Sequence, residues 1–139
     1  EDIASVSNEF QDNFFEALKQ KGIENYDKAI EALEKCQTLQ SDNAIVYFEL
    51  GKNYLALKKY KDAYDNFEKV TQMDPKNRWA WAGMYDVCYD THDYNQSIVI
   101  VQKLIDFGHR RISMVTSAIE NTNNFEKFEV STGKDRVAG

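Results

Sequence analysis

The sequence has little of the residues that most often carry chemistry in proteins. Among its 139 residues there are two cysteines and two histidines. Cys36 and Cys88 follow no metal or redox spacing, so we expect two small buried hydrophobic side chains. Asp90, His92 and Asp93 crowd one turn, where solvated polar residues are expected, and a metal site needs at least three converging ligands. With no catalytic constellation to assemble, we expect a protein that is not an enzyme and that uses no metal or cofactor.

Positive charge is also scarce. Lysine and arginine number 17 against 23 acidic residues, which gives a formal net charge of −6. Proteins that bind nucleic acid cluster Lys and Arg against the phosphates, and the longest basic run here is only His109-Arg110-Arg111. The sequence therefore argues against a nucleic-acid partner. No stretch approaches the roughly 20 apolar residues of a membrane helix. Because the chain begins at Glu1 without a methionine, we expect it to be a processed or truncated piece.

What the sequence does have is a period of 34 residues. Tyr26, Tyr60 and Tyr94 are spaced by that interval, and each opens a similar phrase: NYDKAIEALEK, KYKDAYDNFEK and DYNQSIVIVQK. A fixed period of this length is typical of stacked repeats, because each unit has a hydrophobic face that it can bury only against its neighbour.

Within this period, apolar residues recur at helical spacing. Residues 1–9 are expected to be a lead-in, in which Ser5 or Ser7 caps a helix that starts near Phe10. Pro75 disfavours a helical Asp74. Any one of the three residues in the run 41–43 offers a cap for the third helix. We therefore expect helices over 10–22, 26–39, 44–57 and 60–73.

The middle repeat carries the pattern Tyr47-x-x-Leu50-Gly51-x-x-Tyr54, then Ala63-x-x-x-Phe67, then Pro75. This pattern resembles the tetratricopeptide repeat, with Tyr47 in place of the usual Trp. The resemblance implies one all-α domain over 1–139, a right-handed superhelix or solenoid of three helix-turn-helix repeats plus a C-terminal capping helix. By register the repeats are 10–43, 44–77 and 78–111, the capping helix is about 112–121, and a flexible tail is about 131–139.

The third repeat departs from the family pattern at two positions. Tyr85 replaces the small residue and His109 replaces the proline. We expect Tyr85 to push the third pair of helices slightly apart or to rotate them.

The resemblance also implies that the first helix of each pair lines a concave groove. Carried over by register, the groove residues are Phe14, Leu18, Ile45, Phe48, Lys52, Leu55, Trp79, Asp86 and Tyr89, together with Gln11, Ala82, Thr116 and Glu120. A long surface of this mainly apolar and aromatic kind is a place for a peptide or a helix to lie. In the alternative interpretation, Phe14 and Phe48 pack between adjacent repeats and never meet a ligand.

Some tetratricopeptide domains hold the acidic C-terminus of a chaperone with Lys and Asn at the fifth and ninth repeat positions. Here those positions hold the pairs Phe14 and Leu18, Phe48 and Lys52, and Ala82 and Asp86. Only Lys52 can bind a carboxylate, which argues against such a clamp.

We therefore predict a non-catalytic scaffold that binds a peptide or helix of a partner protein in the groove. The alternative is a structural or assembly module that acts through self-association. The phrase WAWAGMYDVCYDTHDYNQSI is also similar to bacterial exported or envelope-associated repeat proteins. That resemblance implies the cell envelope or periplasm, with the cytoplasm as the alternative.

Overall fold

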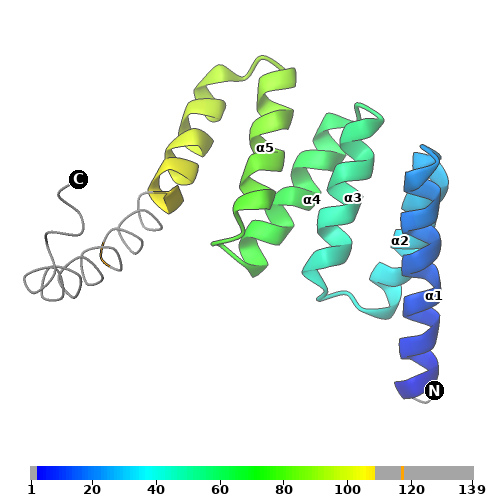
Figure 1. Cartoon of the computed structure of the whole chain (residues 1–139). Coiled ribbons are helices and arrows are strands. Elements are labelled where there is room, and N and C mark those ends of the chain that lie inside the picture. Colours follow the sequence, from blue (N-terminus) through cyan, green and yellow to red (C-terminus); the bar gives the residue numbers. More distant parts are fainter. Residues whose placement is uncertain (1–2, 109–116, 118–139) are drawn as a thin grey trace, which may run out of the picture. The chain divides into compact units, whose positions relative to one another are not determined.

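The computed structural model describes residues 3–108 and 117, and every regular element in this part of the chain is an α-helix (Figure 1). The helices are α1 (Ile3–Gly22), α2 (Tyr26–Leu39), α3 (Ala44–Ala56), α4 (Tyr60–Met73) and α5 (Arg78–Asp90). A further helix begins at residue 94 and continues through residue 108. The predicted all-α fold of helix pairs is confirmed.

The chain divides into two compact units, Glu1–Leu104 and Ile105–Gly139. The features described below belong to the first unit. The predicted tail at 131–139 and the predicted capping helix at 112–121 lie outside the described residues, except for residue 117, which is helical.

The helix bounds follow the sequence pattern except at the N-terminus. α2 and α4 span the predicted residues, and α3 is one residue shorter. The prediction of a lead-in before Phe10 is wrong, because α1 begins at Ile3 and contains Ser5 and Ser7. The physical reason is that the apolar face continues backward from Phe10 through the half-buried Val6, four residues earlier, so the helix stays amphipathic.

The turn inside each pair repeats the 34-residue period in the backbone. Each turn contains one residue with φ close to 60°, in the left-handed region: Glu24, Lys58 and His92. The next N–H closes the turn by donating to a carbonyl five residues earlier, at 2.8 to 2.9 Å, in the pairs Asn25–Gln20, Lys59–Tyr54 and Asp93–Cys88. This bond is the six-to-one closure of a Schellman motif, which satisfies carbonyls at the end of a helix.

The connections between pairs are equally regular. Of the three candidate caps for α3, the side chain that acts is Asn43, whose Oδ1 accepts from the Ile45 N–H at 3.0 Å. One period later, Asn77 Oδ1 accepts from two N–H groups of α5, both at 3.1 Å. Asparagine at this position supplies one of the acceptors that the first turn of a helix lacks. In both connections an aromatic side chain also donates to a carbonyl six residues before it, from Tyr47 to Ser41 at 2.6 Å and from Trp81 to Pro75 at 2.9 Å.

Two hydrophobic clusters form the core of this unit. The first joins α1, α2 and α3 and includes the buried Cys36; the second joins α4, α5 and the helix that follows, and includes the buried Cys88. At the centre of the second cluster the ring of Phe67 lies against two glycines, Gly51 of α3 and Gly83 of α5. A methyl group added at either glycine would be 2.7 Å from a ring atom of Phe67. The small residues thus let α3 and α5 approach one aromatic ring from two sides.

Candidate partner-binding face

The candidate site is the face of α1, α3 and α5 that carries the groove positions, which we call the groove face. Four of its predicted residues expose large apolar side chains: Leu18 (39 %), Ile45 (60 %), Trp79 (63 %) and Tyr89 (55 %). They come from all three helices, and α3 also contacts α5 directly. Exposed aromatic and aliphatic side chains are typical of recognition surfaces, which makes this face the candidate for binding an apolar segment.

Three other predicted groove residues pack inward. Phe14 stacks on Phe10 with ring centroids 5.9 Å apart and lies against the first core cluster. Phe48 meets the ring of Phe67 edge-on at 5.9 Å, and Leu55 is half-buried against the second cluster. These contacts hold the helices together, as the alternative interpretation expected for Phe14 and Phe48. A substitution at either position would therefore disturb folding as well as any ligand.

Trp79 is held in place by its local structure. It is the second residue of α5, and its backbone N–H donates to the Asn77 cap at 3.1 Å. The guanidinium of Arg78 lies 4.9 Å from the centroid of the Trp79 ring, a cation–π contact. The cap thus fixes the backbone of Trp79, and its exposed ring contacts Arg78.

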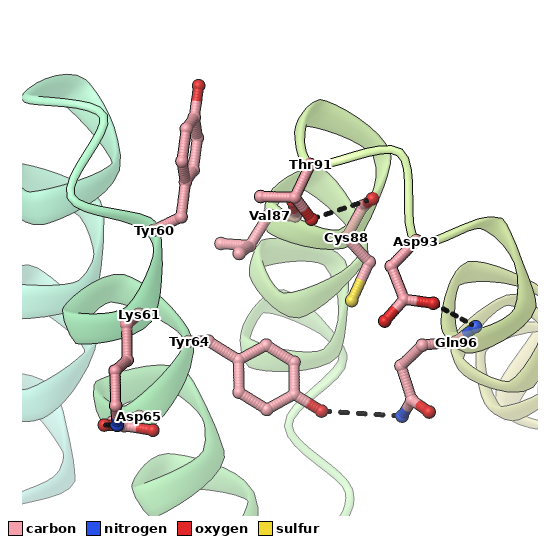
Figure 2. Close-up of a pocket in the computed structure, with 9 residues that line it drawn as sticks. All are labelled: Tyr60, Lys61, Tyr64, Asp65, Val87, Cys88, Thr91, Asp93 and Gln96. Atoms are coloured by element: carbon pink, nitrogen blue, oxygen red, sulfur yellow. Dashed lines mark hydrogen bonds and ion pairs between the residues drawn. The ribbon is translucent and has the colours of Figure 1, made fainter.

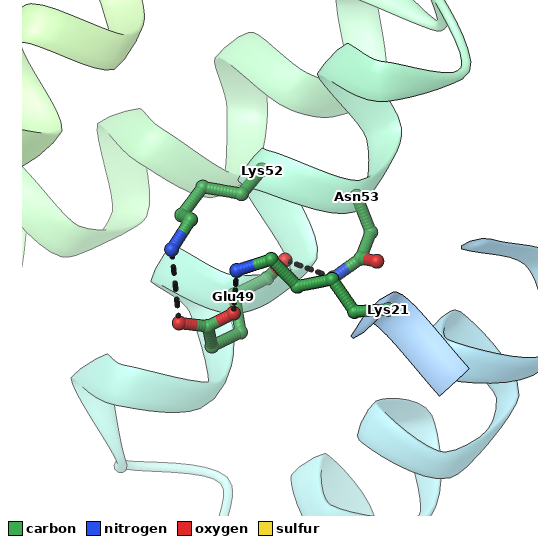
Figure 3. A network of polar contacts seen from close by, with 4 residues as sticks. All are labelled: Lys21, Glu49, Lys52 and Asn53. Atoms are coloured by element: carbon green, nitrogen blue, oxygen red, sulfur yellow. Dashed lines mark hydrogen bonds and ion pairs between the residues drawn. The ribbon is translucent and has the colours of Figure 1, made fainter. Parts of the chain in front are cut away.

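A charged cluster lies between α1 and α3 (Figure 3). The carboxylate of Glu49 on α3 accepts from two ammonium groups: Lys21 Nζ lies 3.0 Å from Oε2, and Lys52 Nζ lies 3.3 Å from Oε1. Next to them, the buried Asn53 donates through Nδ2 to the Glu49 carbonyl at 2.7 Å. In the part of the chain that is described, Asn53 Oδ1 has no hydrogen-bond partner.

Sequence reasoning named Lys52 but missed Lys21 and Glu49. The signal for Lys21 was available, because it stands 34 residues before Leu55 and 68 before Tyr89, both of which were assigned to the groove. Glu49 stands where the next repeat has Gly83. Its pairing with Lys21 depends on how α1 and α3 are placed in the fold.

Two ammonium groups share one carboxylate, so the cluster keeps one net positive charge. Burial lowers the pKa of both lysines, but at Lys21 the contact with the Glu49 carboxylate outweighs burial and the pKa is raised. At Lys52 burial prevails, the neighbouring Lys21 adds to it, and the pKa is lowered. Lys52 Nζ also lies 5.1 Å from the centroid of the Phe48 ring. Of the two lysines, Lys52 is the more exposed and lies farther from Glu49.

On α5 the groove face carries acidic side chains. Asp86 stands one period after Lys52, and Asp90 follows one helical turn later; both side chains are exposed. Partial burial, and then the nearby Asp90 carboxylate, raise the pKa of Asp86. Opposite charges therefore occupy equivalent positions on neighbouring repeats.

A separate cavity of about 470 Å³ lies where α4, α5 and the start of the next helix meet (Figure 2). Its polar groups are largely engaged with one another: Gln96 Nε2 lies 3.4 Å from Tyr64 Oη, and Asp93 accepts from the Gln96 N–H at 3.2 Å. The Cys88 thiol faces this cavity, but burial, and then Asp93, raise its pKa. A thiol of raised pKa stays protonated at neutral pH and is a poor nucleophile.

Neither a metal site nor a membrane span is present among the residues that the structure describes. No group of three or more His, Cys, Asp and Glu side chains in residues 3–108 is placed to hold a metal ion. His92 lies in the turn before residue 94, and its Nδ1 is 2.9 Å from Tyr94 Oη. The helices of the described part are too short or too polar to cross a bilayer.

The arrangement of capped helix pairs with a 34-residue period defines an α-helical repeat protein, and the chain belongs to the tetratricopeptide repeat family. One family model described as a tetratricopeptide repeat matches residues 54–118 and a second matches residues 20–43, together more than half of the chain. No curated protein sequence matches the chain significantly.

Solved structures with the same fold have low sequence identity. The crystal structure of MamA superposes with a TM-score of 0.71 at 16% identity, over 75% of this chain and 61% of that one. The chain therefore spans about three fifths of that MamA chain. The TPR domain of Arabidopsis OM64 has a TM-score of 0.66 at 15% identity, over 70% of this chain and 81% of that domain. The second TPR domain of Spaghetti (RPAP3), bound to an HSP90 peptide, has a TM-score of 0.67 at 16% identity, over 76% and 99%.

Proposed function

We propose that this protein is a non-catalytic interaction scaffold that binds a peptide or helical segment of a partner protein on the groove face. The observation that carries the proposal is the exposure of Leu18, Ile45, Trp79 and Tyr89 on successive first helices. Solenoids use such extended faces for binding, and aromatic side chains are frequent anchors at interfaces.

The structural neighbours support a peptide as the ligand class. The Spaghetti (RPAP3) domain is bound to an HSP90 peptide, and the TPR2B domain of yeast Sti1 is in complex with an Hsp70 peptide. The ligand of this chain differs from a purely acidic tail, because Glu49 lies in the cluster and Lys52 alone among the fifth and ninth positions can bind a carboxylate. An apolar segment fits the exposed side chains better.

The proposal is tested by selecting peptides and then truncating one exposed isoleucine. Twelve-residue peptides displayed on phage are selected on the immobilised wild-type protein, and the affinity of a selected peptide is measured by calorimetry. Ile45→Ala is expected to weaken binding by about tenfold, because it removes exposed apolar contact area at the site.

The matched control is Ile98→Ala. Ile98 is exposed to 67 % and lies on the helix after α5, outside the groove face. We expect this variant to bind as the wild type does. Failure to select any peptide, or an equal loss of affinity in both variants, would count against the groove face as the site.

Self-association is the second hypothesis, and one observation favours it. α1 exposes Ile3 and Phe15, and the turn that follows it exposes Ile23; these three side chains are 65 % exposed or more. A second copy could cover them. Light scattering over a wide concentration range is the test: a constant monomer mass removes this hypothesis, and a mass that rises with concentration and falls back in Phe15→Ser supports it.

A further inference from the structure

We propose that the partner segment carries one acidic and one basic side chain beside its apolar residues, with the acidic one directed to Lys52 and the basic one to Asp86. This inference rests on the groove-face function proposed above. It adds the charge pattern of the ligand and the orientation in which that ligand lies across the repeats.

The basic end of the site is the cluster of Lys21, Glu49 and Lys52. Lys52 is the accessible member, since its side chain is 38 % exposed while that of Glu49 is 12 % exposed. Its contact with Glu49 is the longer of the two, 3.3 Å against 3.0 Å. Lys21 alone keeps Glu49 paired, so Lys52 can bind a second carboxylate without leaving a buried charge unpaired.

The acidic end is formed by Asp86 and Asp90, which lie one turn apart on the exposed face of α5. In the described part of the chain neither carboxylate makes an ion pair. The cation on the same helix, Arg78, precedes Asp86 by eight residues, roughly 12 Å along the helix axis, and is stacked on Trp79. Two negative charges at this position favour a lysine or an arginine of the partner and disfavour an acidic residue.

The two ends are held at a fixed spacing by the repeat. Lys52 and Asp86 occupy equivalent positions on α3 and α5, which both border the Phe67 ring and contact each other. Helices in contact lie roughly 8–10 Å apart. An extended ligand would cover that distance with about three residues, and a helical ligand with about six. The spacing of the two charges in a bound peptide therefore reports its conformation.

The test is an exchange of charges on both sides of the interface. A peptide is first selected from the displayed library on the wild-type protein, and a second peptide is made in which its acidic and basic residues are exchanged. Calorimetry then measures both peptides on the wild type and on the double variant Lys52→Glu/Asp86→Lys. We expect the exchanged peptide to bind the wild type at least about tenfold more weakly, and to recover on the double variant.

The matched control is Lys61→Glu/Asp65→Lys, which exchanges an exposed Lys–Asp pair on α4 at 2.9 Å, outside the groove face. It should leave the affinities of both peptides unchanged. If the melting curve shows that the Lys52→Glu/Asp86→Lys variant is unfolded, Asp86→Lys alone serves, because this exposed side chain lies outside both core clusters. Asp86→Lys should bind the selected peptide more weakly than the wild type does. For a peptide whose basic residue is replaced by Glu, the loss of affinity caused by Asp86→Lys should be smaller.

The outcomes separate this inference from the function on which it rests. Selected peptides that are apolar, that depend on Ile45 and that show no charge pattern would overturn the inference and leave groove binding in place. Equal affinities of the two peptides for the wild type would do the same. If no peptide is selected, or if the Lys61/Asp65 exchange abolishes binding, groove binding itself is contradicted.

Discussion

The contact of Phe67 with two glycines gives the sharpest test of how the repeats pack. In Gly83→Ala the new methyl group would be 2.7 Å from the Phe67 ring, whereas ordinary contacts begin at about 3.4 Å, so about 0.7 Å of movement is needed. The ring has little room to give way, because it also borders Gly51, where an added Cβ would likewise be 2.7 Å from a ring atom. Either α3 or α5 must therefore move.

The expected magnitude follows from two opposing effects. Alanine is favoured over glycine inside a helix by about 1 kcal/mol. Overpacking a well-filled core costs about 1–3 kcal/mol, and this ring closely borders both glycines, which favours the upper part of that range. We predict that Gly83→Ala lowers the free energy of unfolding by about 1–2 kcal/mol in net, a fall in Tm of several degrees for a chain of this size.

The assay is urea unfolding followed by circular dichroism, with Gly22→Ala as the control. A Cβ at Gly22 meets nothing within 4 Å, and its φ is not positive, so this variant should be as stable as the wild type or slightly more so. Adding Phe67→Leu to Gly83→Ala should cost less than the sum of the two single changes. If Gly83→Ala matches or exceeds the wild type in stability, the packing argument is refuted.

Three further predictions concern stability. Ala63→Leu should lower Tm clearly more than Lys59→Ala, because Ala63 is fully buried between helices and Lys59 is exposed; equal melting curves would count against the register. Asn77→Ala should cost about 1 kcal/mol in chemical unfolding, since it removes the cap of α5. Asp86→Asn should raise Tm at pH 7, because burial and then Asp90 raise the pKa of Asp86 and disfavour its ionised form in the folded state. That gain should shrink as the pH falls through the raised pKa of Asp86, because the wild-type carboxyl then becomes protonated; a gain that grows at low pH would contradict the sign.

Much of the fold could be predicted because short local sequence signals mark the helix ends in each repeat. Pro75 marks the end of α4, and the repeated Tyr phrase marks the start of each second helix. The start of α1 was predicted wrongly because serine is a good helix cap in isolation. Whether a serine caps the helix or lies inside it depends on whether Val6 is buried, and Val6 is half-buried.

The candidate site was only partly predictable, for a related reason. Register alone assigned Phe48 and Trp79 to the same face, but it could not tell that Phe48 meets Phe67 while Trp79 stays exposed. The pairing of Lys21 with Glu49 joins residues 28 positions apart on different helices. Such contacts depend on how two helices pack, which a periodic pattern indicates only in outline.

The most direct test of groove binding is site-specific photo-crosslinking with a selected peptide. A photoreactive phenylalanine analogue is placed either at Trp79, on the groove face, or at Lys61, beside the cavity between α4 and α5. Both side chains are exposed, so both variants should fold. We predict a crosslinked product from position 79 and none from position 61. A product from position 61 alone would place the partner at the cavity and contradict binding on the groove face.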